Sequence, residues 1–307
     1  MNYTLHQLTI FLKVVETQSI TKTAEALHLS QPAVSIQLKK FQQQFYIPLI
    51  EIINKKVFVT EFGLEIAESA QTILNELNTI DQRLHKYKGL LSGTIKISSV
   101  STGKYVIPYF LADFLKQNES VELRLDVSNK TKVIEALERN ETDFALVSVL
   151  PKQLQLNKIE LMPNHLFLVG NSEGVNKKTE ANKLVLESLP LIYREEGSAT
   201  RNAMEKFIEK NRIKVRKKIQ LTSNEAVKQA VIAGIGYSIM PLIGIKNELK
   251  SKQLHIIPVK GLPLKSTWNI IWLKNKNLSP VAKAFVKKIE SEKTKIIDKH
   301  FMGSLLK

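Results

Sequence analysis

The feature that most constrains this chain is an unbroken helical pattern over residues 61–90. The segment has no proline, and Gly63 is its only glycine before the last turn. Its apolar residues recur at alternating spacings of four and three: Ile66, Ala70, Ile73, Leu77, Ile80, Leu84 and Tyr87. A 3.5-residue repeat keeps one seam facing a partner helix, so we expect a helix roughly 45 Å long that pairs with a second copy of itself.

The residues before this helix predict a small helical domain, residues 1–60. Over residues 5–45, apolar positions recur at helical spacing in three short runs. We expect Thr21 to cap the second helix and Ser30 the third, whose first turn holds Pro32, because a missing N–H is harmless there. The buried stripe of the third helix is Val34, Leu38, Phe41 and Phe45.

The opposite face of the third helix is polar at its start. A short helix, a tight turn and a second helix with small and amide side chains are typical of a helix-turn-helix, although a plain three-helix bundle fits the spacing equally well. Gln and Ser reach base edges in the major groove, and Lys neutralises phosphate. Residues 49–53 and 57–60 predict a hairpin with a basic tip, a wing. The candidate DNA-contacting residues are Thr21, Lys22, Ser30, Gln31, Pro32, Ser35, Ile36, Lys39, Lys55 and Lys56.

Beyond the linker helix, residues 61–92, strands and helices alternate, which predicts an α/β domain over residues 93–307. We expect strands near 94–100, 121–127, 144–149, 166–169, 191–193, 218–221, 237–240 and 267–273, and helices at 105–116, 131–139, 199–210, 225–233 and from 279 onward. The pattern divides into two Rossmann-like subdomains with a cleft between them: subdomain I, about 93–164 and 270–307, and subdomain II, about 165–269.

Hydroxyl residues gather where three strands are expected to give way to helices. The first group ends the first strand, the second is Thr131, and the third opens the helix at residue 199. Hydroxyls and free N–H groups at helix starts bind anions, although each hydroxyl alone is more simply a helix cap. Arg201 adds a fork that suits a carboxylate or phosphate. The candidate effector residues are Ser99, Ser101, Thr102, Thr131, Ser198, Thr200 and Arg201.

The composition argues for a regulator or binding protein and against an enzyme. The net charge is +16, and the excess of positive charge lies entirely in residues 201–307, mostly as lysine. We interpret these lysines first as a solvated surface. There is no cysteine, no His-Glu-x-x-His, no Gly-x-Ser-x-Gly and no P-loop, so we expect no catalytic residue, metal or cofactor. The N-terminus lacks a basic-then-apolar leader, and no stretch is long enough to span a membrane, so we expect a cytoplasmic protein.

With these residues in view, the chain resembles a LysR-type transcriptional regulator along its full length. The most specific stretch is residues 19–39, SITKTAEALHLSQPAVSIQLK, followed by a T-x-x-G at Thr60 to Gly63. The second half is most similar to regulators of carbon-fixation (RuBisCO) operons, in STGKY at 101–105, GSATR at 197–201, NEAVKQA at 224–230 and GLP at 261–263 with Trp268. The resemblance implies a winged helix-turn-helix, a periplasmic-binding-protein type effector domain, promoter DNA as partner, a homodimer or tetramer, and a small anionic effector. A regulator of this kind can also contact RNA polymerase.

Two departures from the family pattern bear on DNA binding. Ile36 stands where arginine is common, and Ile50-Glu51-Ile52 replaces the Phe-x-Arg of the wing. We therefore expect fewer phosphate contacts and a shallower salt dependence, since each neutralised phosphate adds about 0.9 to the slope. Ile36 can instead meet a thymine methyl. Two alternatives stay open: a two-lobed anion-binding protein or enzyme, and a DNA-binding protein whose ligand domain no longer responds.

Overall fold

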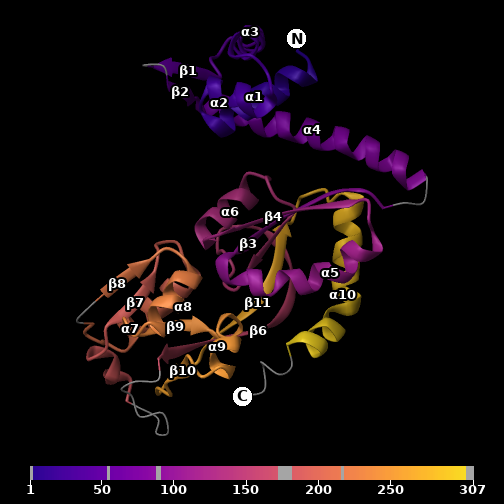
Figure 1. The fold of residues 1–307 in the computed structure, drawn as a ribbon. Coiled ribbons are helices and arrows are strands. Elements are labelled where there is room, and N and C mark those ends of the chain that lie inside the picture. Colours follow the sequence, from indigo (N-terminus) through magenta and orange to yellow (C-terminus); the bar gives the residue numbers. More distant parts are fainter. Residues whose placement is uncertain (1–2, 54–55, 88–90, 172–181, 216–217, 302–307) are drawn as a thin grey trace. The chain divides into compact units, whose positions relative to one another are not determined.

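The protein forms two compact units, residues 1–90 and 91–307 (Figure 1). The computed structural model describes residues 3–53, 56–87, 91–171, 182–215 and 218–301. The first unit contains α1 (Leu5–Thr17), α2 (Ile20–Leu27), α3 (Gln31–Gln42), the hairpin β1 (Ile50–Ile53) and β2 (Lys56–Val59), and α4 (Glu61–Tyr87).

An apolar core joins the three short helices of the first unit. Phe11 of α1 lies 5.1 Å from Phe41 of α3, centre to centre, and both rings are fully buried. Val34 and Leu38 join them, as the spacing predicted, while Phe45 is only partly buried. The three predicted helices are therefore confirmed.

The hairpin is joined to α4 by the Thr60-x-x-Gly63 turn. The Thr60 hydroxyl donates to the carbonyl of Pro48 at 2.7 Å and accepts from the Gly63 N–H at 2.9 Å, so it starts α4 and fixes the hairpin at once. A Cβ on Gly63 would lie 2.0 Å from the Leu49 carbonyl oxygen. Only glycine lets the helix pass the strand this closely.

The first apolar seam residues of α4 pack inside the core of the first unit. Ala70 is 1 % exposed and packs with Ala67 in the core that includes α1, and Ile66 is partly buried there. Ile73, the next seam residue, is 41 % exposed. The expectation that the whole seam faces a second copy was therefore wrong for its first two positions, because α1 already covers them. The side chains of Ile80, Leu84 and Tyr87 lie outside the described residues.

The second unit is built on one mixed sheet whose strand order is β10-β6-β11-β5-β3-β4, with β9 also paired to β6. The parallel strands β3, β4 and β5 lie at one end, and β11 runs antiparallel between β5 and β6. The strand bounds are Gly93–Val100 (β3), Val121–Ser128 (β4), Phe144–Val147 (β5), Leu156–Gly170 (β6), Ser238–Pro241 (β9), His255–Ile256 (β10) and Leu264–Leu273 (β11).

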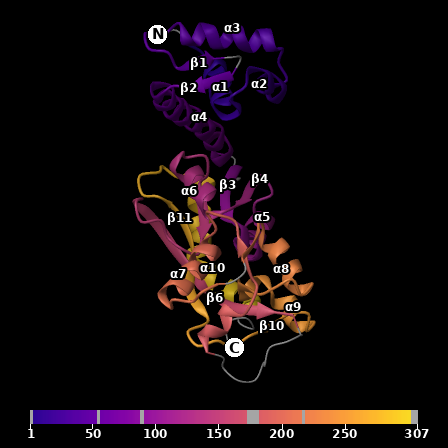
Figure 2. The ribbon, with the colours of Figure 1, turned by 90° about the vertical axis from the view of Figure 1, so that its left-hand side faces the viewer.

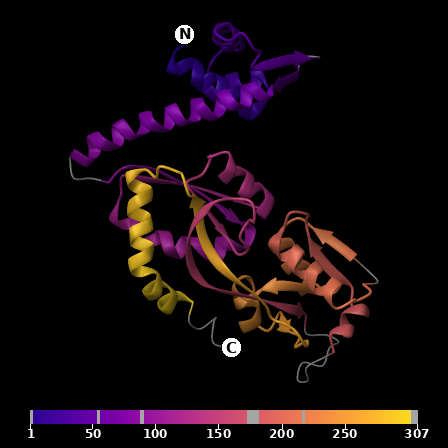
Figure 3. The same cartoon turned by 180° about the vertical axis from the view of Figure 1, so that it is seen from behind.

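Two long strands, β6 and β11, connect the two subdomains of this unit (Figure 3). Each strand contributes to two apolar cores. Met162 of β6 and Trp268 of β11 belong to the core of subdomain I, while Leu166 of β6 belongs to the core of subdomain II. The cores thus separate near residues 163–167 of β6 and 264–267 of β11. Trp268 and Asn269, expected in subdomain II, lie in the strand segment of subdomain I.

Helices cover the sheet of subdomain I. They are the short η1 (Ser101–Tyr105), α5 (Ile107–Gln117), α6 (Lys130–Glu138) and α10 (Pro280–His300). Phe285 of α10 stacks edge-on against Phe114 of α5 and contacts Phe144 of β5, so α5 and α10 form one layer on the sheet.

Subdomain II adds a separate parallel pair, β7 (Leu191–Arg194) and β8 (Lys218–Leu221) (Figure 1). A bridge from Leu191 to Tyr237 ties this pair to the end of the main sheet. The helices of subdomain II are η2 (Lys183–Glu187), α7 (Ala199–Lys210), α8 (Asn224–Ile232), η3 (Leu242–Gly244) and α9 (Lys246–Lys250); Figure 2 labels α7, α8 and α9. The sequence pattern predicted neither β10, α9 and η2 nor the first ten residues of β6.

Candidate DNA-binding face and ligand cleft

The turn between α2 and α3 sets the position of the candidate DNA-contacting residues. Ser19, not Thr21, caps α2: its hydroxyl accepts from the Lys22 N–H at 3.3 Å, and Ser19 has the extended backbone that a cap requires. Thr21 and Lys22 are exposed in the first turn of α2. Ser30 caps α3 through the Ala33 N–H at 3.3 Å, with Pro32 in the first turn, as predicted.

The outer face of α3 is open to solvent and almost uncharged. Gln31, Pro32 and Lys39 are exposed, and Ile36 is 54 % exposed. Ser35 is half-buried, and its hydroxyl accepts from the Gln31 amide at 3.2 Å. The face therefore offers an amide, hydroxyls and an aliphatic surface at its start and a cation farther along, which suits base edges first and phosphate second.

The described part of the hairpin carries one exposed cation, Lys56. Its strands pair antiparallel from Ile50 opposite Val59 to Ile53 opposite Lys56. Lys56 is exposed, but so are Glu51, Ile52, Ile53 and Phe58. Lys55 lies outside the described residues. Among the hairpin residues that the structure describes, apolar side chains dominate the surface.

The candidate ligand-binding residues of subdomain I lie where the adjacent strands β3 and β4 end together. Val100 is paired with Ser128, so the segments that follow, Ser101 with Thr102 and Asn129 with Thr131, leave the same sheet edge. Asn129 caps α6 through the Lys132 N–H at 3.0 Å, which leaves Thr131 exposed in the first turn. The helix α6 begins at Lys130, one residue before the predicted start at Thr131.

Gly197 of subdomain II lies next to Thr131 of subdomain I. A Cβ on Gly197 would lie 2.7 Å from the Thr131 hydroxyl oxygen, and Gly197 has a φ of +80°. Both facts require glycine at this position. The next residue, Ser198, is buried and caps α7 through the Arg201 N–H at 3.5 Å. The structure thus brings Ser101, Thr131 and Ser198 to one region, as predicted from strands far apart in the sequence.

Besides Ser198, two more hydroxyl residues of the predicted set are buried. Ser99 is fully buried, and its hydroxyl donates to the Val100 carbonyl at 3.1 Å. Thr102 is buried, while Ser101 and Thr200 are half-buried. Ser99 therefore supports the turn into η1 from beneath, and the side chains nearer the cleft surface are Ser101 and Thr131.

Arg201 has its guanidinium already engaged within subdomain II. Nε donates to Glu205 at 2.8 Å, and Nη1 donates to Gln220 at 2.8 Å and to the Arg194 carbonyl at 3.3 Å. Nη2 lies 3.6 Å from a carboxylate oxygen of Glu196. Two carboxylates thus offset its charge. The fork holds the segment before α7 in place and has few donors left for a ligand.

Two lysines add positive charge near this region. Burial lowers the pKa of the Lys130 ammonium, and the positive charge of Lys206 lowers it further. Lys130 opens α6 in subdomain I and Lys206 belongs to α7 in subdomain II, so the repulsion between the two ammonium groups acts from one subdomain on the other. An anion placed there relieves this repulsion. Sequence reasoning missed both lysines, because nothing in the sequence signals that α6 and α7 are neighbours.

A second polar network joins the subdomains beside the cleft. The Tyr105 hydroxyl donates to Glu225 at 3.2 Å, and Lys228 lies 3.1 Å from Glu225 and 2.7 Å from Glu248. Burial opposes the charge of Glu225, but hydrogen bonds from Gln229, Lys228 and Tyr105 outweigh it and lower the pKa of this carboxyl. Tyr105 follows β3 and Glu225 opens α8, so this contact links the subdomains on a second side.

Neither metal chemistry nor a membrane is indicated by the described part of the chain. Within it, no three His, Asp or Glu side chains gather as a metal site would require. None of its helices combines the length and the apolar character needed to cross a bilayer.

Two family profiles match the chain. Residues 5–64 match the bacterial regulatory helix-turn-helix protein, lysR family, and residues 88–293 match the LysR substrate binding domain. The chain is 35 % identical over 288 residues to the HTH-type transcriptional activator CmpR of Synechocystis sp., covering 93 % of this chain and 94 % of that protein. It is also 35 % identical over 293 residues to a RuBisCO operon transcriptional regulator of Allochromatium vinosum, covering 95 % and 97 %.

Solved structures show the same fold. The regulatory domain of CcmR from Synechocystis, in complex with 2-PG, matches at a TM-score of 0.62 and 26 % identity, covering 69 % of this chain and 99 % of that one. Full-length CbnR complexed with its target DNA matches at a TM-score of 0.65 and 19 % identity, covering 94 % and 99 %. At that identity the second likeness bears on the fold alone.

Proposed function

Because the chain belongs to the LysR family of transcriptional regulators, we propose that it binds promoter DNA through α3 as a dimer and responds to a small anion held between its effector subdomains. Family membership confirms the prediction of a regulator over that of an enzyme. The observation that carries the ligand half of the proposal is the close approach of Gly197 in subdomain II to Thr131 in subdomain I, and the repulsion that Lys206 exerts on Lys130 supports it.

The proposal for DNA binding rests on the exposed start of α3. Gln31 and Ser35 supply base-edge hydrogen bonds, Ile36 meets a thymine methyl, and Lys39 and Lys56 meet phosphates. Two copies are needed to read two half-sites, and the exposed Ile73 of α4 is the first described seam residue free to contact a partner helix. We propose a dimer through α4, a tetramer of such dimers, and action in the cytoplasm, where the promoter is.

The proposed effector is a phosphorylated or carboxylated metabolite. The relative CcmR was solved with 2-PG, 2-phosphoglycolate, which carries both groups. In this chain, Ser101, Thr131 and the N–H groups at the starts of α6 and α7 would donate to such an anion, and Lys130 and Lys206 would offset its charge. Arg201 acts as a positioning residue, through its bonds to Gln220 and Arg194.

The proposed mechanism is a population shift between two hinge states. The anion contacts both subdomains, so it favours the closed state, which changes how the paired α3 helices are spaced on the operator. Energetic coupling of this kind requires that the ligand binds the two states with different affinities.

A gel shift of the full-length protein on the DNA upstream of its own gene tests the proposal. Specific binding is expected, with a change in affinity or footprint when 2-phosphoglycolate is added. Specific binding that no phosphorylated or carboxylated acid alters would favour a ligand domain that no longer responds. Anion binding without specific DNA binding would favour the two-lobed binding protein.

A further inference from the structure

The short turn η1 lies between the candidate anion-binding residues and a bond to subdomain II. It begins with Ser101 and Thr102, which follow β3 at the sheet edge where the candidate residues of subdomain I gather. It ends with Tyr105, whose hydroxyl donates to the carboxylate of Glu225 at 3.2 Å. Glu225 belongs to the first turn of α8, in subdomain II. One turn therefore connects the place where an anion would bind to a hydrogen bond between the subdomains.

The turn is packed directly on the sheet of subdomain I. Gly103, at its middle, is buried. A Cβ on Gly103 would overlap the Ser99 hydroxyl oxygen of β3 and would lie 2.7 Å from a methyl carbon of Leu146 of β5. The backbone of the turn thus lies against both strands with no room between them. Because close-packed groups transmit a displacement instead of absorbing it, a shift of Ser101 is passed on to Tyr105.

Subdomain II contacts Tyr105 at two places. The first is Glu225, which lies 3.1 Å from the Lys228 ammonium, and Lys228 also lies 2.7 Å from Glu248 of α9. The second is η3, because a Cβ on Gly244 would lie 3.1 Å from a ring carbon of Tyr105. The hydroxyl of Tyr105 therefore contacts α8, and its ring lies against η3. The position of this side chain determines how closely both elements approach η1.

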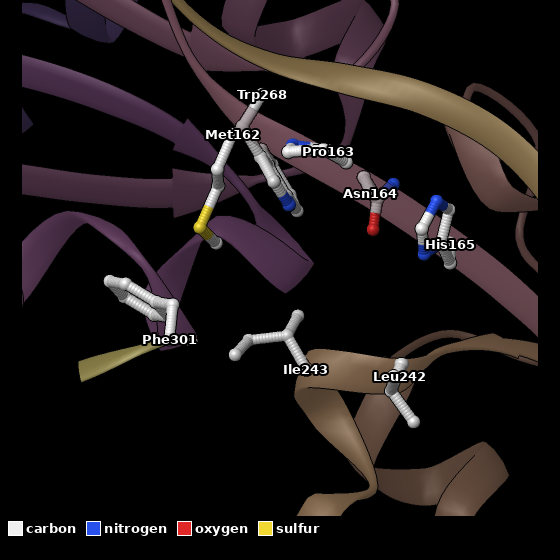
Figure 4. A pocket seen from close by; sticks show the side chains of 8 residues that line it. All are labelled: Met162, Pro163, Asn164, His165, Leu242, Ile243, Trp268 and Phe301. Carbon is white, nitrogen blue, oxygen red and sulfur yellow. The ribbon is translucent and has the colours of Figure 1, made fainter. Parts of the chain in front are cut away.

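A neighbouring contact between η3 and subdomain I is packed more loosely. A cavity large enough for water lies there, lined by Ile243 of η3 and by Met162, Trp268 and Phe301 of the core of subdomain I (Figure 4). Figure 4 shows Ile243 across this space from Met162 and Phe301. Atoms that line a cavity lack contacts on one side, so they hold their neighbours less firmly. The hydrogen bond and ring contact of Tyr105 are therefore the better defined constraint on η3.

We propose that Tyr105 is the positioning residue that links occupation of the anion site to the hinge, an inference that rests on the anion binding proposed above. The anion displaces Ser101, η1 moves with Ser101, and the hydroxyl of Tyr105 moves relative to Glu225. The Tyr105–Glu225 hydrogen bond is formed in one hinge state and lost in the other, so it contributes to the free-energy difference between them. Tyr105 acts in this way without touching the anion.

The first test measures the hinge without any ligand. The chain has no cysteine, so Glu138→Cys on α6 and Glu209→Cys on α7 place spin labels at exposed positions of the two subdomains. Labelled full-length protein is mixed with excess unlabelled protein, so that electron paramagnetic resonance measures distances within one chain. We expect Tyr105→Phe, which keeps the ring, to shift or broaden the distance distribution. The control is Tyr109→Phe, which removes a hydroxyl from the exposed side of α5 and should change nothing. The same distribution with Tyr105 and with Tyr105→Phe would overturn the proposal.

The second test measures the coupling between ligand and operator. 2-Phosphoglycolate is titrated calorimetrically into full-length protein with and without operator DNA. Tyr105→Phe should still bind 2-phosphoglycolate, but the factor by which operator changes this affinity should fall about threefold or more. Glu225→Ala should lower the factor similarly, and the double variant should lower it no further, because both changes remove the same bond.

The outcomes separate this inference from the proposed function. An unchanged coupling factor in Tyr105→Phe, or losses that add in the double variant, would overturn the role of Tyr105 while anion binding stands. A wild-type protein that binds no phosphorylated or carboxylated acid would contradict the proposed function, and with it the link from the anion site to Tyr105. The distances measured without ligand would then show only whether Tyr105 positions the subdomains.

Discussion

The outer face of α3 and the cleft of the second unit handle charge in opposite ways. On α3, Gln31, Ser35 and Ile36 are neutral, and the cation Lys39 is exposed. In the second unit, Arg201 and Lys228 each face two carboxylates, whereas the charge of Lys206 acts against that of Lys130. The face of α3 therefore offers mainly neutral groups, whereas the second unit pairs Arg201 and Lys228 with carboxylates and leaves Lys130 under the repulsion of Lys206, which a bound anion would relieve.

A negative charge on the outer face of α3 should weaken operator binding. Ile36→Glu puts a carboxylate toward the phosphates, and we expect operator affinity to fall about 100-fold because like charges then meet at close range. Anion binding should be unchanged. The measurement is a gel shift at fixed salt, with Val149→Glu, exposed in the other unit, as the control for added charge. A loss below threefold would mean that α3 does not face the duplex.

A methyl group at Gly197 should weaken the binding of the anion between the subdomains. Gly197→Ala places its Cβ 2.7 Å from the Thr131 hydroxyl oxygen, so the subdomains cannot approach as closely. We expect about a tenfold loss of affinity for 2-phosphoglycolate, since misplaced donors lose their hydrogen bonds, and unchanged operator affinity without ligand.

The control for Gly197→Ala is Gly234→Ala. Gly234 has a φ of +77°, so alanine there meets the same backbone strain outside the cleft. Both variants should lower the melting temperature by a similar amount. Equal loss of ligand binding in the two would assign the effect to strain and not to the Thr131 contact.

Removing the charge of Lys130 tests whether this lysine contributes to anion binding. Lys130→Gln is expected to weaken the binding of 2-phosphoglycolate about threefold at neutral pH, and Lys132→Gln, exposed on the same helix, should not. The lowered pKa of Lys130 means that the free protein loses this proton below pH 10.5. Wild-type affinity should therefore fall as pH rises from neutrality toward 10.5, and that slope should flatten in Lys130→Gln by calorimetry.

The smallest expected effect concerns the network beside the cleft. The pKa of Glu225 is lowered, so its contribution to stability is present above its ordinary pKa and is lost as pH falls through the lowered one. Glu225→Gln should cost roughly 0.5 kcal/mol at pH 7, because the side chain is partly exposed, and less at an acid pH below the lowered pKa. Urea unfolding at both pH values measures this, with Glu138→Gln as control. An equal loss at both pH values would contradict a charge-based contact.

The helix-turn-helix could be predicted almost completely because its signals are local. Caps, turn and buried stripe all lie within residues 19–45, and Ser30, Pro32 and Val34 behave as their spacing indicated. Thr21 was assigned as cap because it is also a hydroxyl residue. Only the backbone of Ser19 is extended, and that decides which hydroxyl can reach the next turn.

The cleft could be predicted only in outline. The sequence places hydroxyl residues after three strands. The hydrogen bond from Arg201 to Gln220 and the effect of Lys206 on Lys130 depend on long-range packing, which the sequence does not reveal. One signal was available: Glu205 lies four residues after Arg201, a spacing that pairs them on a helix. The first half of β6 carries Pro163 and polar residues, and it becomes a strand through its pairing with β11.

The central claim is that the cleft ligand and the operator are coupled through the hinge. Isothermal titration of 2-phosphoglycolate into the full-length protein, alone and saturated with operator DNA, tests it most directly. Reciprocity predicts that operator changes ligand affinity by the same factor, of about 5- to 150-fold, by which ligand changes operator affinity. Ligand that binds with identical affinity in both titrations would contradict the account.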